Sequence, residues 1–235
     1  SVAVSPDAGP GDPAASGAGS NLDTPDGVRR RASGGLLLLR AGASRARQWA
    51  RDGLGPVVVI PDPNGWTVVV PHGGRTFAAA PFDDGVGAVL GRPVRRRLLP
   101  TIGVALVGTR LAISVVPAVL RPARVWLVWE PGAGLVRPPG LAPATVAQLV
   151  AAADRREHRD VAASMLADGR GSAGRVLNDI FEVLGLPGAD LATGARAPLN
   201  EPGAVLVEPS REDVGRFDRT VHEVRRWREE VEGSS

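Results

Sequence analysis

The spacing of apolar residues changes several times along the chain, and each change predicts a different element. Residues 1–27 carry almost no large apolar side chain, so they predict a disordered tail. From Leu39 to Ala50 the apolar residues recur every three or four positions, which indicates a helix. Gly53 and the Gly55-Pro56 pair end this helix. The first strand of the expected sheet therefore begins at Val57.

The middle of the chain predicts a sheet, because short apolar runs alternate there with turn residues. The strongest signal is a β-hairpin whose Asn64-Gly65 pair lies inside the turn. Gly108-Thr109 joins two further strands, and the last strand, 124–129, is apolar on both faces. Such a strand is typical of the middle of a sheet that is covered on both sides. The predicted strands are 57–60, 66–70, 75–79, 103–107, 111–116 and 124–129, with a short helix at 83–90.

Helical spacing returns after residue 130. Pro143 begins one helix, a second helical run follows, and Ser172 is the expected N-cap of a third helix that Gly185 ends. The expected ranges are 143–153, 161–166 and 172–184 for these helices, and 204–207 for a short strand within an otherwise irregular segment, 188–209.

The last predicted element is an amphipathic helix that begins after Ser210, with acidic residues in its first turn. Its apolar residues form one narrow stripe, which must be buried against another surface. That surface is either the rest of this chain or a partner, and both alternatives stay open. The candidate partner-binding residues are Val214, Phe217, Val221, Val224, Trp227 and Val231.

Together these elements predict an α+β fold, with a mainly antiparallel sheet of about five to six strands, flanking helices and a helical C-terminal part. The expected organisation is a disordered tail (1–27), a sheet domain (28–140), a helical part that packs on the sheet or forms a small second unit (141–187), a loop (188–209) and the C-terminal helix (210–235).

The amino-acid composition excludes several kinds of catalytic and binding site. All 28 basic residues are Arg, and the chain contains no Lys, Cys or Tyr. Without Lys there is no phosphate-binding loop of the G-x-x-x-x-G-K-[ST] type and no Schiff-base site. Without Cys there is no thiol nucleophile, disulfide or thiolate zinc site. We expect a cytoplasmic protein, because zero Cys suits a reducing compartment and residues 1–27 lack the apolar run of a secretory signal.

Charge is distributed unevenly. Residues 1–150 have a balance of +7 and residues 151–235 a balance of −4, which gives the overall +3. This asymmetry predicts a contact surface. Arg29–Arg31 and Arg95–Arg97 are the basic clusters that would meet phosphates, but the modest net charge argues against a dedicated nucleic-acid binder.

The motifs that carry chemistry elsewhere are incomplete here. Gly169–Gly174 matches G-x-G-x-x-G, but it follows a helix rather than a strand, so a connection between helices explains it better than a nucleotide site. His158-Arg159-Asp160 resembles a kinase triplet without its other motifs. The three histidines are far apart in sequence, which disfavours a metal site. We therefore predict no catalytic residue, cofactor or metal, and lean against an enzyme.

Residues 98–120 allow two interpretations. Arg110 is their only charged residue, so their length suits a membrane-spanning helix. A central Arg costs about 2.5–3.5 kcal/mol on insertion scales, however, and Pro117 and the hairpin-like spacing favour buried strands. We expect buried strands.

The leading functional hypothesis is a soluble, non-catalytic protein-interaction or regulatory module, which binds another protein or itself through the C-terminal helix. One alternative is a small-molecule sensor with a pocket between sheet and helices. The other is membrane association through 98–120.

Overall fold

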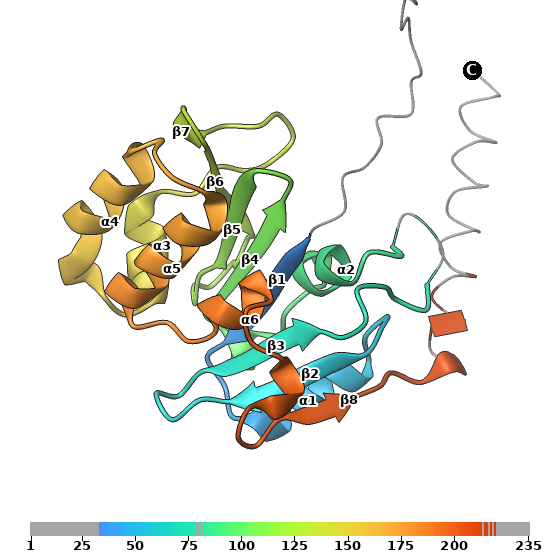
Figure 1. Ribbon diagram of the computed structural model, residues 1–235. Helices are drawn as coiled ribbons and strands as arrows, with labels where there is room; N and C mark the ends of the chain where they lie inside the picture. The colour runs from blue at the N-terminus through green and yellow to red at the C-terminus, as the bar shows by residue number, and fades with distance from the viewer. Residues whose placement is uncertain are drawn as a thin grey trace, which may run out of the picture.

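The computed structural model describes residues 33–78, 80, 82–212, 214, 215, 217 and 219. Within them one antiparallel sheet of eight strands runs through the molecule, in the order β7-β6-β5-β4-β1-β3-β2-β8 (Figure 1). The predicted α+β class is confirmed, although the sheet is larger than expected. The strands are β1 (Gly34–Leu39), β2 (Val57–Pro61), β3 (Thr67–Pro71), β4 (Thr101–Val107), β5 (Arg110–Val116), β6 (Val125–Glu130), β7 (Gly134–Val136) and β8 (Val205–Val207).

Helices cover both faces of this sheet. The α-helices are α1 (Ala43–Arg51), α2 (Gly85–Gly91), α3 (Val146–Ala152), α4 (Arg159–Ala167), α5 (Ala173–Leu184) and α6 (Ala189–Thr193). Three short 3₁₀ turns are η1 (Arg96–Leu98), η2 (Arg156–His158) and η3 (Pro198–Asn200). The buried residues of α1 and α2 belong to one apolar cluster and those of α3 to α6 to another, so the two groups lie on opposite faces.

The helices and strands from β1 to β4 form two interlocked units. Each unit consists of two strands that flank a third strand and a helix that connects the two. β1 and β2 flank β3 and are antiparallel to it, and α1 connects them. β3 and β4 flank β1 in the same way, and α2 connects them. The resulting order, β4-β1-β3-β2 with both helices on one face, is the double split βαβ connectivity called ferredoxin-like. β5 to β7 extend the sheet beyond β4, and β8 extends it beyond β2.

The central strand β1 was missed by the sequence analysis. Leu36 to Leu39 are all 0% exposed. All four pair with β4 on one side, and Leu37 to Leu39 also pair with β3 on the other. The first helix begins only at Ala43, so the helical spacing that included Leu39 was wrong there. A strand buried on both faces is an unbroken apolar run, which has no alternation to distinguish it from a helix.

Most other predicted elements are confirmed. The hairpins β2–β3 and β4–β5 pair as expected, and β8 falls within 204–207. The side chain of Asp84 accepts a hydrogen bond from the Gly87 amide and caps α2. Ser172 caps α5, which ends at left-handed Gly185. These predictions were correct because a helix cap forms its hydrogen bonds with backbone groups only a few residues away.

Two predictions about strands need correction. Residues 75–78 form no strand, because Arg75 makes only an isolated bridge with Asp84. β6 lies one strand from the edge rather than in mid-sheet. Its second face is only partly covered, since Trp126 retains intermediate exposure while Val128 is 4% exposed.

Residues 98–120 form no continuous helix. They contain the end of η1 and the β4–β5 hairpin, whose inward residues are buried in the sheet. The interpretation of this segment as a membrane-spanning helix was therefore wrong. Among the described residues, none of the helices has the length and apolar character that crossing a bilayer requires.

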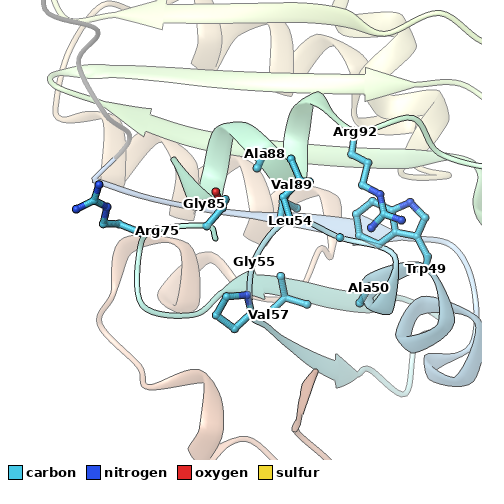
Figure 2. Close-up of a pocket in the computed structure, with 13 residues that line it drawn as sticks. Trp49, Ala50, Leu54, Gly55, Val57, Arg75, Gly85, Ala88, Val89 and Arg92 are labelled. Carbon is cyan, nitrogen blue, oxygen red and sulfur yellow. The ribbon is translucent and has the colours of Figure 1, made fainter. Parts of the chain in front are cut away.

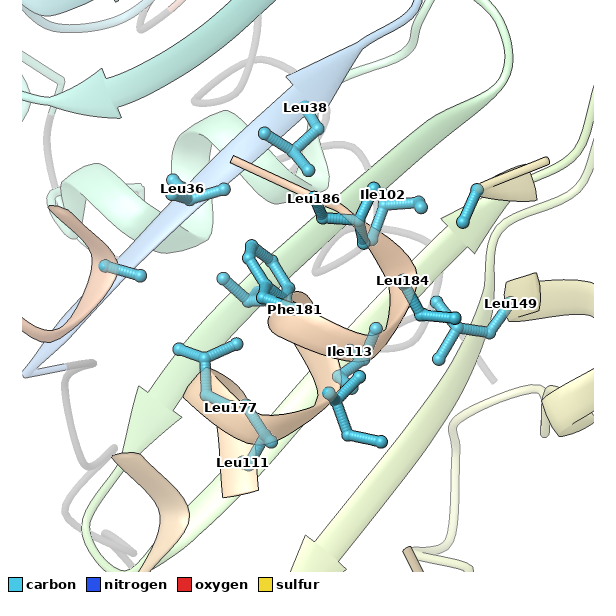
Figure 3. Packing of buried hydrophobic residues seen from close by; sticks show 14 of the residues in the cluster. Leu36, Leu38, Ile102, Leu111, Ile113, Leu149, Leu177, Phe181, Leu184 and Leu186 are labelled. Atoms are coloured by element: carbon cyan, nitrogen blue, oxygen red, sulfur yellow. The ribbon is translucent and has the colours of Figure 1, made fainter. Parts of the chain in front are cut away.

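The larger core lies between the sheet and α3 to α6. Phe181 of α5 is 1% exposed and packs at the centre of this cluster (Figure 3). Each fully buried Leu or Phe stabilises the fold by about 1.5–3 kcal/mol relative to an exposed one. The labelled neighbours in Figure 3 are Leu36, Leu38, Ile102, Leu111, Ile113, Leu149, Leu177, Leu184 and Leu186.

The smaller core lies on the other face, under α1 and α2. Here α2 sits close to the sheet because glycines face it: a Cβ on Gly35 would lie 2.7 Å from Cγ1 of Val86. At Gly103 the nearest atom to such a Cβ would be Cδ2 of Leu90. The close approach of α2 brings the chain segment that follows it, 92–98, against the end of α1.

Candidate functional site

The contact between α1 and segment 92–98 is built on Trp49. The indole is 5% exposed, and its Nε1–H donates a hydrogen bond to the carbonyl oxygen of Pro93 at 3.1 Å. The guanidinium carbon of Arg92 lies 4.3 Å from the centre of the indole ring, in a cation–π contact (Figure 2). Trp49 of α1 therefore contacts segment 92–98 twice, through the backbone of Pro93 and through the side chain of Arg92.

This contact gathers arginines from two parts of the chain. Nη2 of Arg97 donates a hydrogen bond to Oε1 of Gln48 at 3.4 Å, and Nη2 of Arg124 donates one to the carbonyl oxygen of Arg92 at 3.0 Å. We call the resulting surface the arginine face. Its members are Arg92, Arg95, Arg96 and Arg97 of segment 92–98, together with Arg124.

One acidic residue, Asp52, lies beside the arginine face. Its Oδ2 atom lies 3.9 Å from Nη2 of both Arg92 and Arg95. Both ion pairs are long, and the Asp52 side chain is 59% exposed, so each contributes little to stability. The arginine face therefore keeps a large excess of positive charge.

Burial of two guanidinium groups makes part of this positive charge energetically unfavourable. It lowers the pKa of Arg92 to about 10; Asp52 partly opposes the shift, and Arg95 adds to it. Burial also lowers the pKa of Arg124. Nε of Arg124 is buried without a hydrogen-bond partner among the described residues. An anion bound beside these guanidinium groups would offset the cost of their desolvation.

The hollow beside the stacked pair is too small for an organic ligand. Its volume is about 20 Å³, which is enough for a water molecule, and Figure 2 shows Arg92 at one end and Arg75 at the other. Arg75 pairs with Asp83 at 3.5 Å. Recognition at the arginine face would therefore take place on its surface rather than in a cleft.

Two larger open pockets lie between the sheet and helices, where the sensor hypothesis expects a ligand. One, of about 580 Å³, lies between the β2–β3 turn and the α5–α6 connection. Its charged residues are mostly acidic, and Arg196 pairs with Glu201 there at 2.6 Å. The other, of about 560 Å³, lies beside α3.

The structure describes two of the six candidate partner-binding residues. Val214 is 3% exposed, and the ring of Phe217 packs edge-on against Phe82 with 5.2 Å between centroids. The guanidinium of Arg211 lies 5.7 Å from the ring of Phe77. The start of the C-terminal helix thus packs on Phe77 and Phe82 of its own chain. The remaining candidates, Val221, Val224, Trp227 and Val231, lie outside the described residues, as does the predicted tail, 1–27.

The other motifs occupy structural positions. The Gly169–Gly174 motif lies at the connection between α4 and α5, as expected, with Gly174 already in the first turn of α5, and Gly169 packs against the backbone of Gly132. Nε2 of His158 lies 3.7 Å from Oε1 of Glu157 at the exposed start of α4. Among the described residues, no three histidine or acidic side chains are grouped so that they could hold a metal ion.

Only one part of the arginine face can be identified from the sequence. The Arg95–Arg97 run is visible as a basic cluster, and the arginines of α1 are visible on a helix. Nothing local indicates that these segments meet, because their contact depends on Trp49 and on the packing of α2. Comparison of the chain with models of known protein families, with curated proteins and with solved structures finds no match. The connectivity of the sheet alone does not specify a function.

Proposed function

We propose that this protein is a non-catalytic interaction module whose arginine face binds an acidic segment of another protein. The observation that carries this proposal is the charge of that surface: five arginines from two segments gather beside a single aspartate, which pairs only weakly with two of them. A positive surface of this kind attracts a negatively charged partner and orients it.

The position of Asp52 supports a carboxylate as the recognised group. Its carboxylate lies between Arg92 and Arg95, at 3.9 Å from each, so the local geometry already accommodates this anion. Arginine is well suited to further carboxylates, because its planar guanidinium donates two parallel hydrogen bonds to the two oxygens.

The burial of Trp49 favours a protein partner over single-stranded nucleic acid. Proteins that bind single strands place bases on exposed aromatic side chains. Trp49 is 5% exposed, and its indole is covered by Arg92, so the aromatic ring at the centre of the arginine face is not available to a base.

Binding of a short fluorescein-labelled poly-glutamate peptide, followed by fluorescence anisotropy, tests the proposal. The triple variant Arg95→Glu/Arg96→Glu/Arg97→Glu should bind at least about tenfold more weakly than the parent. The matched control is Arg137→Glu/Arg159→Glu/Arg170→Glu, which changes net charge equally on exposed residues elsewhere and should bind within about twofold of the parent. Equal loss in both variants, or tighter binding of single-stranded DNA of the same charge, would contradict the proposal.

The C-terminal stripe remains a second proposed contact for a partner. Because Val214 and Phe217 already pack on their own chain, the residues from 221 onward would supply this contact. Removing residues 221–235 should then weaken capture of a protein partner while the 33–219 region keeps its melting temperature. Unchanged capture would restrict recognition to the arginine face.

A further inference from the structure

The open groove beside α3 has the size and lining of a small-molecule site. It lies at the end of the sheet where β5 ends and β6 begins, between the 117–123 loop and α3, and its volume is about 560 Å³. Ligand pockets usually fall within about 300–1,000 Å³ and have mostly apolar walls. The apolar lining includes Pro100, Pro117, Val119, Val125, Ala147 and Ala151.

The apolar walls are open to solvent rather than filled by the protein. Val119 is 49% exposed, and Val125 and Ala151 have intermediate exposure. Ala147 and Ala151 are one helical turn apart on α3, so their small side chains leave room along one face of this helix. A bound apolar chain would remove this surface from water, which is favourable.

Every charged side chain that lines the groove is an arginine. Arg121 has no ion pair or hydrogen bond within the described part of the chain. Arg156 lies 3.9 Å from Asp154, and both side chains are more than two thirds exposed, so this pair holds Arg156 weakly. Gln148 is the remaining polar residue. Its Oε1 accepts a hydrogen bond from the Thr145 amide, which leaves its –NH₂ group as a donor.

We propose that this groove binds an amphiphilic carboxylate, with the hydrocarbon chain along α3 and the carboxylate at Arg121 and Arg156. A mostly apolar lining that also contains two guanidinium groups matches both parts of such a molecule. The lining contains no carboxylate that would repel the head group. The groove shares no lining residue with the arginine face, so this proposal does not depend on the one above.

Titration with decanoate, read as displacement of a fluorescent fatty-acid probe and confirmed by calorimetry, tests the site. Ala151→Trp places a large side chain in the groove and should weaken decanoate binding at least about tenfold. Ser164→Trp, at an exposed position on α4, is the matched control and should bind as the parent does. Thermal unfolding of each variant checks that it is folded.

The charge of the head group is tested separately. Arg121→Gln should weaken decanoate binding about fivefold and leave binding of decan-1-ol unchanged, whereas Arg137→Gln should alter neither. Absence of decanoate binding to the parent, equal binding by folded Ala151→Trp, or equal effects of Arg121→Gln on acid and alcohol would each overturn the proposal.

Discussion

The two faces of the sheet differ in the size of their cores and in the charge at their edges. On the face covered by α3 to α6, the buried apolar cluster contains about twice as many of the described residues as on the other face, and includes Phe181 and Trp129. On the face covered by α1 and α2, Gly35 and Gly103 allow α2 to pack closely against the sheet. Arg92 and Arg124, whose guanidinium groups are desolvated, border this smaller core. The comparison indicates that stability depends mainly on the first face, and that the second is free to carry binding residues.

The largest expected effect is on the face covered by α3 to α6. Phe181→Ala removes a side chain that is 1% exposed and leaves a cavity among large neighbours. The free energy of unfolding should fall by about 3–5 kcal/mol. Chemical denaturation measures this change, with Val161→Ala, 50% exposed on α4, as a control expected to change it by less than about 0.5 kcal/mol. A loss below 1 kcal/mol for Phe181→Ala would remove the proposed difference between the faces.

A smaller effect is expected where α2 packs on the sheet. Gly35→Ala places a methyl group against the carbonyl oxygen of Val104 and 2.7 Å from Cγ1 of Val86. The backbone oxygen cannot move aside, so the free energy of unfolding should fall by about 1–3 kcal/mol. Gly91→Ala, whose new methyl group meets open space at the end of α2, is the control and should be neutral or stabilising. Equal denaturation midpoints for Gly35→Ala and the parent would show that α2 is not packed this closely.

The start of the C-terminal helix should contribute less than either core. Phe217→Ala removes the edge-on contact with Phe82, which predicts a loss of about 0.5–1.5 kcal/mol in the free energy of unfolding. The reciprocal variant Phe82→Ala and the double variant complete a double-mutant cycle. Additive effects of the two substitutions would contradict a direct contact.

The smallest expected effect concerns the charge of Arg92. Arg92→Met keeps an unbranched chain over Trp49 and removes a desolvated guanidinium, so at neutral pH the free energy of unfolding should stay within about 1 kcal/mol of the parent. Because burial lowers the pKa of Arg92 to about 10, its charge destabilises the folded state at neutral pH. This penalty disappears as pH rises through 10, so the parent should gain stability relative to Arg92→Met above that pH. If the parent instead lost stability relative to Arg92→Met above pH 10, the charge of Arg92 would not be destabilising the folded state.

The same comparison explains what the sequence could predict. α5 follows directly from its apolar spacing, the Ser172 cap and Gly185, and the β2–β3 hairpin from Asn64-Gly65. These signals are contained within a few residues. β1 was missed because burial on both faces removes the alternation that marks a strand. With β1 absent from the prediction, the double split βαβ connectivity could not be recognised.

The arginine face could not be predicted from the sequence for a related reason. Gln48 and Arg97 are 49 positions apart, and they meet because Trp49 donates a hydrogen bond to Pro93. The sequence does show an excess of arginine in residues 1–150. It cannot show that part of this excess converges, because convergence depends on how α1 and α2 pack on one face of the sheet.

Mapping of the poly-glutamate site by amide chemical shifts tests the central claim most directly. On titration, perturbed amides should be confined to α1, residues 92–98 and Arg124, and amides of α3 to α6 should not move. Perturbations centred on α3 to α6, or spread evenly over the described surface, would show that the arginine face is not the binding surface.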